Sequence, residues 1–240
     1  MYKRFFFDLD KTLTASRSPM AEEHAAIFQR LVRERDVVVV TGGTIEQIRE
    51  QVTPQFDGQY YLLAQSGNQL VDKSGKIVWD EKLSPEQVAE IYRYIDMLKK
   101  HFAIQVRDEN DLVENRGAQI AYSVLGFRED VQKKYAFDPD QSKRNAALAA
   151  LDKERAELLK LDVEIVPAGT TNFSFLPAGK HKGFNVGRFL THMGWNKDEC
   201  IYFGDALFPG GNDETVNGVI PTQQVNSPDD TFIFIREMLD

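Results

Sequence analysis

Residues Phe5–Thr14 read FFFDLDKTLT, and this stretch decides the fold. A short apolar run bounded by turn residues predicts a buried strand, and a run this aromatic is typical of a parallel strand covered on both faces. Asp8 and Asp10 follow it directly, at the end of the strand where open α/β sheets place their ligands. Because two close carboxylates repel each other unless a cation separates them, the pair predicts a metal site, and its hard oxygen ligands favour Mg²⁺. On its own the pair would more often be solvated acids at the end of an edge strand, so the prediction depends on partners later in the chain.

Composition limits the class of protein. The chain has 240 residues, of which 42% are hydrophobic, and a net charge of −8. It is therefore long enough for a substantial core, and its acidic balance argues against a nucleic-acid partner. No stretch approaches the ~20 apolar residues of a membrane span, and Asp8 ends the first apolar run too early for a signal peptide. The single cysteine, Cys200, excludes an internal disulfide. These features predict a cytoplasmic protein without a membrane partner.

A second strand is expected at Val37–Val40, directly before the turn Thr41-Gly42-Gly43. Glycine lets a backbone approach a phosphate closely, and the helix predicted over 45–51 would present free N–H groups there. Taken alone, these residues would more often form a plain strand-to-helix turn. Ser18 and Pro19 predict the N-cap and first position of a helix over 19–35. Strand, helix and strand in this order predict a right-handed parallel βαβ unit.

The middle of the chain changes in character. A third strand is predicted at 62–64, followed by a hairpin that pairs 69–71 with 76–79 around Gly75. From Ser84, the cap of a helix predicted over 85–101, the pattern becomes that of an α+β domain. Its further predicted elements are strands near 104–106, 112–115, 119–123, 163–166 and 172–176 and a charged helical stretch over 140–160. We therefore predict an inserted domain over residues 83–177 and a core formed by residues 1–82 and 178–240.

Polar groups recur where the core pattern returns. Lys182 precedes an apolar helix, and a strand predicted at 201–203 ends in Gly204 and Asp205. Asn212 and Asp213 come after a proline-glycine loop, and a last strand within 219–225 and a helix over 229–239 close the chain. If the core strands are neighbours in one parallel sheet, all of these polar groups meet the Asp8 pair at one edge.

Each group then has a physical role in phosphoryl transfer. Asp8 is expected to attack phosphorus as the nucleophile, and Asp10 to act first as general acid and then as general base. The turn Thr41-Gly42-Gly43 would hold the phosphoryl oxygens, and Lys182 would neutralise their charge. The expected metal ligands and the groups that orient them are Asp8, Asp10, Asp205, Asn212 and Asp213.

This order of residues resembles the haloacid dehalogenase superfamily of phosphotransferases. The shared pattern is DxDxT after the first strand, a threonine after the second motif strand, a later lysine, and GD…ND, with Lys11 in place of a motif glycine. The resemblance implies a Rossmann-like α/β core with a parallel sheet, an aspartyl-phosphate intermediate and a Mg²⁺ cofactor. The large insert is similar to the α+β cap domain of subclass IIB, which includes sugar phosphatases and eukaryotic-type phosphomannomutases.

Most of the chain resembles the eukaryotic-type phosphomannomutase family more closely, and the segments that show this include DLDKTLTASR, VENRGAQIAYSVLG and YFGDALFPGGNDE. This implies a small phosphorylated sugar as substrate, a homodimer formed through the cap, substrate contact by Arg17, and binding of a distal phosphate by Arg116. Two more phosphate-binding arginines of that family correspond to Phe127 (or Arg128) and Lys134. Its sugar-contacting serine and aspartate correspond to Asn172 and Ser174.

Two activities are compatible with these residues, because water and a reoriented sugar phosphate can accept the phosphoryl group from the same core. The depleted cap arginines favour a phosphatase, since lysine offers a point charge where arginine offers a bidentate fork, and phenylalanine offers neither. Arg17 and Arg116 remain compatible with a phosphomannomutase that converts mannose 6-phosphate to mannose 1-phosphate. A non-catalytic sugar-phosphate sensor is a distant alternative, disfavoured because Asp8 and Asp10 are both present.

Overall fold

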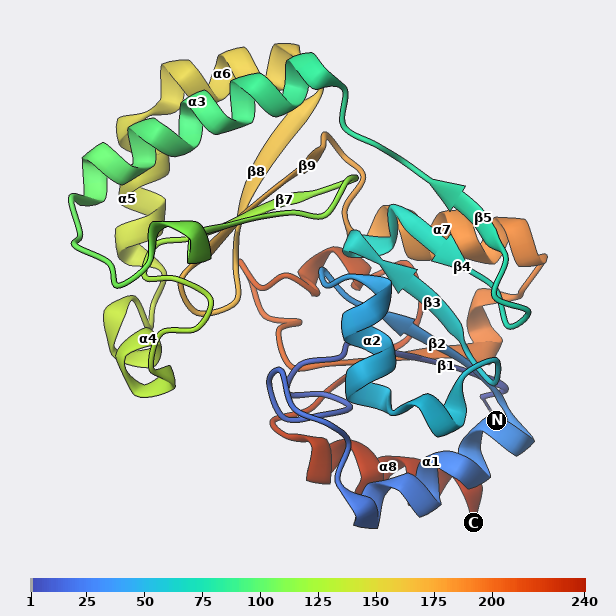
Figure 1. The fold of residues 1–240 in the computed structure, drawn as a ribbon. Coiled ribbons are helices and arrows are strands. Elements are labelled where there is room, and N and C mark those ends of the chain that lie inside the picture. Colours follow the sequence, from blue (N-terminus) through green and yellow to red (C-terminus); the bar gives the residue numbers. More distant parts are fainter. Residues whose placement is uncertain (1) are drawn as a thin grey trace. The chain divides into compact units, whose positions relative to one another are not determined.

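The computed structural model describes residues 2–240, which form two compact units (Figure 1). The core unit comprises the chain up to Asp80 together with Lys180–Asp240, and the insert unit comprises Glu81–Gly179. The core unit has a mostly parallel sheet and the insert unit a separate antiparallel sheet. This arrangement confirms the predicted fold class. Among the described residues, no helix combines the length and apolar character needed to cross a bilayer.

The core sheet has the strand order β11-β10-β1-β2-β3-β4-β5. Its first five strands run parallel, and β4 and β5 are added antiparallel as the predicted hairpin. The strands are β1 (Arg4–Phe7), β2 (Asp36–Val40), β3 (Tyr61–Ala64), β4 (Gln69–Val71), β5 (Ile77–Asp80), β10 (Cys200–Gly204) and β11 (Thr222–Gln224). Strand β1 therefore lies inside the sheet, as its aromatic sequence predicts.

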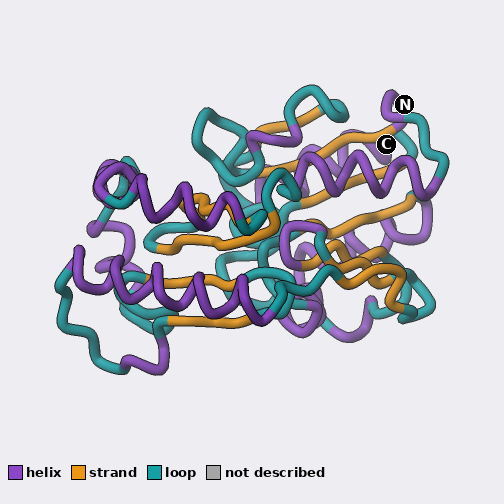
Figure 2. Tube along the Cα trace, turned by 90° about the horizontal axis from the view of Figure 1, so that it is seen from above, coloured by secondary structure: helices purple, strands orange, loops and turns teal. Residues whose placement is uncertain are grey.

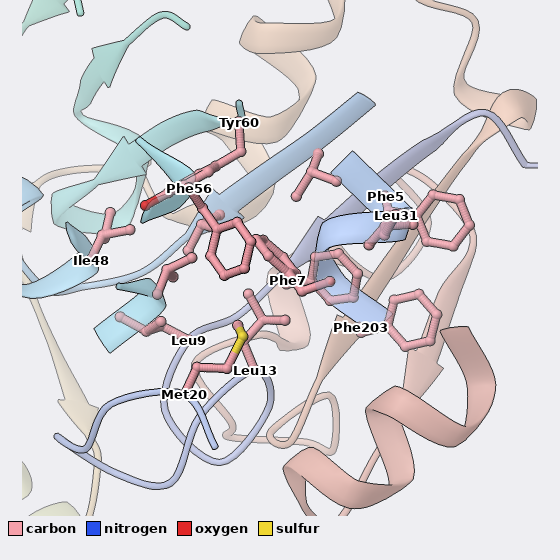
Figure 3. Packing of buried hydrophobic residues seen from close by; sticks show 14 of the residues in the cluster. Phe5, Phe7, Leu9, Leu13, Met20, Leu31, Ile48, Phe56, Tyr60 and Phe203 are labelled. Atoms are coloured by element: carbon pink, nitrogen blue, oxygen red, sulfur yellow. The ribbon is translucent and has the colours of Figure 1, made fainter. Parts of the chain in front are cut away.

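Helices cover both faces of this sheet. They are α1 (Glu22–Glu34), α2 (Ile45–Val52), α7 (Lys182–Met193) and α8 (Pro228–Leu239). Phe5 and Phe7 point to the face covered by α1, α2 and α8, where they share a buried cluster with Leu31 and Ile48 (Figure 3). Phe6 points the opposite way and packs edge-on against Phe189 of α7. The alternation of strand side chains thus fixes β1 between two apolar layers.

Two core elements differ from the sequence prediction. Helix α1 begins at Glu22, not near Pro19, and its N-cap Ala21 makes no side-chain capping bond. The reason is that Met20 is buried in the core and donates its backbone N–H to the Gln51 carbonyl, which keeps the chain extended up to Ala21. The last strand is also shorter than 219–225, because only Thr222–Gln224 pair with β10.

The insert unit combines helices with a small sheet of order β6-β7-β9-β8 (purple and orange in Figure 2). Its elements are α3 (Pro85–Phe102), β6 (Val113–Asn115), β7 (Ile120–Ser123), α4 (Val131–Phe137), α5 (Ser142–Ala150), α6 (Asp152–Lys160), β8 (Val163–Ala168) and β9 (Asn172–Pro177). Ser84 caps α3 as predicted, and it does so in a capping box with Gln87. Alternate residues of β7 and β9, such as Tyr122 and Phe173, join the helices in one buried cluster.

One predicted strand of the insert is wrong, and the structure adds detail at two helical segments. Residues 104–106 form no strand; Ile104 and Val106 pack against the cluster from an irregular segment that begins at the left-handed Ala103. The charged stretch 140–160 is two helices, because the backbone leaves helical geometry at Leu151. Helix α4 had no counterpart in the prediction, since its sequence lacks a clear apolar period and none of its residues is buried.

Candidate active site

The parallel strands β1, β2 and β10 are neighbours in the sheet, and each is followed directly by a polar residue. In the register of the sheet, Phe7 lies beside Val39 of β2 on one side and beside Phe203 of β10 on the other. Asp8, Thr41 and Asp205 follow these strands within two residues, so all three lie at the carboxyl ends of adjacent strands. The Asp8 N–H continues the ladder by donating to the Phe203 carbonyl at 2.9 Å. This is the edge at which parallel sheets bind ligands.

Lys182 lies between two of the aspartates. Its Nζ donates to Asp8 Oδ1 at 2.6 Å and to Asp213 Oδ1 at 2.7 Å, and all three side chains are buried. Lys182 is the first residue of α7, whose N-cap His181 accepts the Phe184 N–H on Nδ1. Helix α7 thus places the ammonium group of Lys182 next to Asp8, although the two residues are 174 positions apart in the sequence.

Tyr202 is a site residue that sequence reasoning missed. Its hydroxyl donates to Asp213 Oδ1 at 2.6 Å, and the Ala206 N–H donates to Asp213 Oδ2 at 3.3 Å. Asp213 therefore acts as an acceptor for three donors and orients Lys182. The signal in the sequence was a tyrosine inside an otherwise apolar strand, since a buried phenolic hydroxyl needs a hydrogen-bond partner.

The electrostatics of the site are dominated by buried negative charge. Burial raises the pKa of Asp8 well above its usual value, the charges of Asp213 and Asp205 raise it further, and Lys182 opposes them. Burial, followed by the charge of Asp213, also raises the pKa of Asp205. Burial lowers the pKa of Lys182, but the charges of Asp213 and Asp8 outweigh it, so Lys182 keeps its proton. One ammonium therefore faces three carboxylates.

A carboxylate cluster suited to a cation results. Single oxygen atoms of Asp8, Asp205 and Asp213 all lie within 4.8 Å of one another. Hard oxygen donors with an excess of negative charge match the ligand preference of Mg²⁺. Among the other residues predicted as metal ligands, the Asp10 carboxylate is not a member of this cluster, and Asn212 lies on the exposed part of its loop.

The remaining core residues frame this edge. Asp10 is partly exposed and accepts the Arg17 N–H on Oδ1 at 2.7 Å, while the Arg17 side chain is exposed. Thr41 is buried, and its Oγ1 accepts the Gly43 N–H at 3.1 Å, which leaves the threonine hydroxyl hydrogen for another acceptor. Gly42 lies between Thr41 and Gly43 in the chain, and Thr44 then forms a capping box at the start of α2.

The substrate residues predicted in the insert lie at separate places on its sheet and on helix α4. Arg116 follows β6, donates to the Glu114 carboxylate and lies 6.0 Å from the centre of the Phe127 ring. Lys134 of α4 donates its Nζ to the Phe127 carbonyl at 2.6 Å. On β9, Ser174 Oγ accepts the Gln119 Nε2 at 3.0 Å, and Asn172 lies at the start of the strand. The structure thus brings Arg116 and Lys134 together around Phe127.

Comparison with known proteins places the chain in a family. A sequence profile of haloacid dehalogenase-like hydrolases matches residues 5–213. The chain belongs to this family. The match spans Asp8, Thr41, Lys182, Asp205 and Asp213, and enzymes of this family generally use a divalent metal. The predicted superfamily is therefore confirmed, and the chain is an enzyme of the phosphatase and phosphotransferase kind.

The chain is also similar to individual enzymes named phosphomannomutases. The chain is similar to phosphomannomutase 1 of Dictyostelium discoideum, at 28% identity over 97% of this chain and 94% of the relative. It is also similar to a phosphomannomutase of Glycine max, at 25% identity over 94% of this chain and 91% of the relative. These similarities agree with the predicted resemblance to phosphomannomutases.

Solved structures support the fold. IMP-bound, N-terminally truncated IMP-nucleotidase of Plasmodium falciparum superimposes with a TM-score of 0.72 at 14% identity, over 99% of this chain and 68% of that one. A haloacid dehalogenase-like hydrolase of Bacteroides thetaiotaomicron gives a TM-score of 0.65 at 16% identity, over 99% of this chain and all of that one (100%). At these identities the likeness establishes the architecture and leaves the substrate to be inferred from the site.

Proposed function

We propose that the chain is a Mg²⁺-dependent phosphohydrolase that removes phosphate from a small phosphorylated sugar through an aspartyl-phosphate intermediate. The observation that carries this proposal is the position of Lys182 Nζ, within 2.7 Å of both Asp8 and Asp213. A buried ammonium beside a buried carboxylate, at a sheet edge that also carries Thr41, suits the attack of one anion on another. A family member with this constellation has the parts needed for phosphoryl transfer.

In the first step, an Asp8 oxygen attacks phosphorus and the bond from phosphorus to the sugar oxygen breaks. Asp10 donates a proton to that leaving oxygen, so that the sugar departs as a neutral alcohol. The Arg17 N–H donates to Asp10 Oδ1 at 2.7 Å and thereby orients this carboxyl group. Lys182 and the Thr41 hydroxyl would hold the phosphoryl oxygens while the charge shifts onto them.

In the second step, water replaces the sugar. Asp10, now ionised, takes a proton from the water, whose oxygen attacks phosphorus. The bond between phosphorus and Asp8 breaks, which restores the Asp8 carboxylate and releases inorganic phosphate. Asp10 ends protonated and ready for the next cycle, so the protons balance.

The residues that would hold Mg²⁺ are Asp8 and Asp205, together with the backbone carbonyl of Asp10. Asp213 fits less well as a direct ligand, because its two oxygens already accept from Lys182, Tyr202 and Ala206. We assign it instead to orienting Lys182, with Asn212 in the surrounding shell. When bound, the ion offsets the repulsion between the Asp8 carboxylate and an anionic phosphate.

Replacing Asp205 with asparagine is expected to raise the melting temperature of the metal-free protein by a few degrees. Burial and Asp213 raise the pKa of Asp205, which means that the ionised carboxylate destabilises the folded state at neutral pH. Mg²⁺ is expected to stabilise the wild type by binding the folded state, and to do so much less in the variant. Thermal unfolding with a chelator and with MgCl₂ measures both effects.

A surface variant serves as control for this experiment. Asp198 is exposed, so Asp198→Asn should leave both melting temperatures as in the wild type. An Asp205→Asn variant that gains as much from Mg²⁺ as the wild type would contradict the assignment of Asp205 as a ligand.

We propose that the insert, residues 83–177, supplies substrate recognition to this core. Arg116 and Lys134 lie near Phe127, and Asn172 and Ser174 lie on β9, so the insert combines two cations with neutral hydrogen-bonding groups. A sugar phosphate offers hydroxyls and an anion to such a surface. In the resemblance to phosphomannomutases, Phe127 (or Arg128) and Lys134 correspond to arginines that bind a second phosphate, and their replacement favours hydrolysis over a reaction that retains a bisphosphate.

Phosphomannomutase activity is the second candidate, and the observation that favours it is the similarity to the Dictyostelium and Glycine enzymes over more than nine-tenths of this chain. In that reaction the aspartyl phosphate would be transferred to the other end of a sugar phosphate. The core residues would act as described above, with a sugar hydroxyl in place of water.

One incubation separates the two candidates. Mannose 1-phosphate, glucose 1-phosphate and their 6-phosphates are supplied separately with Mg²⁺ and a trace of hexose bisphosphate, and phosphorus NMR follows every product. We expect inorganic phosphate without isomerised sugar phosphate. Isomers without inorganic phosphate would establish the mutase instead, and the absence of both from every incubation would refute a hexose phosphate substrate.

A further inference from the structure

The turn after β3, residues 65–67, is hydrogen-bonded to the turn Thr41-Gly42-Gly43, which we call the phosphate-binding turn. The Ser66 N–H donates to the Thr41 carbonyl and the Gln65 N–H to the Gly43 carbonyl, both at 2.8 Å. Gln65, Ser66 and Gly67 have consecutive positive φ angles of 54°, 61° and 86°. Two adjacent non-glycine residues in this left-handed region are strained and persist only where the surroundings hold them. The position of Thr41 therefore depends on whatever holds this turn.

Two buried asparagines hold it. Asn68 Nδ2 donates to the Gln65 carbonyl at 2.9 Å and to the Lys180 carbonyl at 3.0 Å. Asn185 Nδ2 donates to the Ser66 carbonyl and to the same Lys180 carbonyl, both at 3.0 Å. Both side chains are fully buried. The Lys180 carbonyl, two residues before Lys182, thus accepts from the side-chain amides of both Asn68 and Asn185. The same two amides also donate to carbonyls of the strained turn.

The fit around Asn185 is close. Its Nδ2 lies 3.3 Å from Asn68 Oδ1, so the two amides contact each other. A Cβ at Gly67 would collide with the Asn185 Cβ, which explains a glycine at the third strained position. Asn185 Oδ1 has no hydrogen-bond partner among residues 2–240, so this amide acts here as a donor. Asn185 also lies one helical turn after Lys182, on the helix that carries the ammonium.

We propose that Asn68 and Asn185 are positioning residues that fix the phosphate-binding turn relative to Lys182. The inference rests on the function proposed above, in which Thr41 and Lys182 hold the same phosphoryl group. Those two groups belong to segments that lie far apart in the chain, and the paired amides connect them through Ser66 and Lys180. Fixed donors stabilise a transition state only when their spacing matches it, and a misplacement of about 1 Å can cost about 100-fold in rate.

The experiment compares Asn185→Ala and Asn68→Ala with Thr231→Val. Thr231 is buried in α8 and donates to the Ser227 carbonyl, so its variant also loses a partly buried hydrogen bond of the core unit. With Mg²⁺ present, kcat and KM are measured on p-nitrophenyl phosphate. The dissociation constant of orthovanadate, which mimics the phosphoryl group in transfer, is measured by calorimetry. Urea unfolding reports the stability of each variant.

For both asparagine variants we expect kcat to fall by at least about tenfold with little change in KM. Orthovanadate should bind to them more weakly by a similar factor. Thr231→Val should keep the wild-type kcat and the wild-type dissociation constant for orthovanadate. Asparagine variants that lose stability but keep wild-type kcat and orthovanadate affinity would overturn the positioning role alone. A wild type that neither hydrolyses the probe nor binds orthovanadate would overturn the proposed function and this inference with it. If Asn185→Ala does not fold, Asn68→Ala decides, because it acts on the same turn through different bonds.

Discussion

Asp8→Asn is expected to lower kcat/KM for phosphate release by about 10⁵–10⁶-fold, the size of effect seen when a covalent nucleophile is removed. A carboxamide oxygen is a poor nucleophile and cannot form a stable acyl phosphate. The fold should survive, because Lys182 keeps its bond to Asp213, and Asp213 keeps its bond to Tyr202. The loss therefore measures the nucleophile and not the scaffold. Phosphate release and circular dichroism of the same sample test both statements.

The control is Asp57→Asn, which makes the same chemical change at an exposed residue that lies 3.8 Å from Arg49. It should retain wild-type turnover. A second readout is trapping of the phosphorylated enzyme after acid quench with a ³²P-labelled substrate, which should succeed for the wild type and fail for Asp8→Asn. Equal labelling of the two proteins would refute Asp8 as the site of the intermediate.

The convergence of several polar side chains could be predicted from sequence because they directly follow strands. Parallel strands have an unmistakable apolar pattern, and each is followed within two residues by its polar group, as with Asp8, Thr41 and Asp205. For these three residues, the missing information was the order of the strands in the sheet. Once β1 lies between β2 and β10, the convergence of these three residues follows from the geometry of a parallel sheet.

Groups that act through tertiary contacts were harder to find. Tyr202 looked like one more apolar strand residue, and only the structure shows its hydroxyl 2.6 Å from Asp213. Asn68 and Asn185 carry no signal in the local sequence pattern, although both are fully buried. The start of α1 was misplaced for the same reason: Ser18 and Pro19 form a good local cap, but the burial of Met20 outweighs that preference. Local patterns do not report which polar groups are buried, and burial decides these cases.

Lys182→Met is expected to lower kcat by about 10²–10³-fold, the effect of removing one group that stabilises transition-state charge. It should also destabilise the protein by about 3–5 kcal/mol at neutral pH, because Asp8 and Asp213 would be left buried without their counter-charge. Methionine keeps the length and apolar volume of the lysine stem, so the change isolates the ammonium. Urea unfolding of the metal-free proteins measures the second effect.

The pH dependence of the stability loss in Lys182→Met provides the decisive check. Lys182 lowers the pKa of Asp8, so its removal raises further a pKa that burial already holds above the usual value. A carboxyl group whose pKa is higher in the folded than in the unfolded state destabilises the fold as pH rises through that folded pKa. The difference in unfolding free energy between wild type and variant should therefore shrink as the pH is lowered from neutral to mildly acidic. Adding Asp8→Asn to Lys182→Met should recover part of the stability at neutral pH without recovering activity. A difference that stays constant with pH would show that the cost of removing Lys182 lies in packing and not in the charge of Asp8.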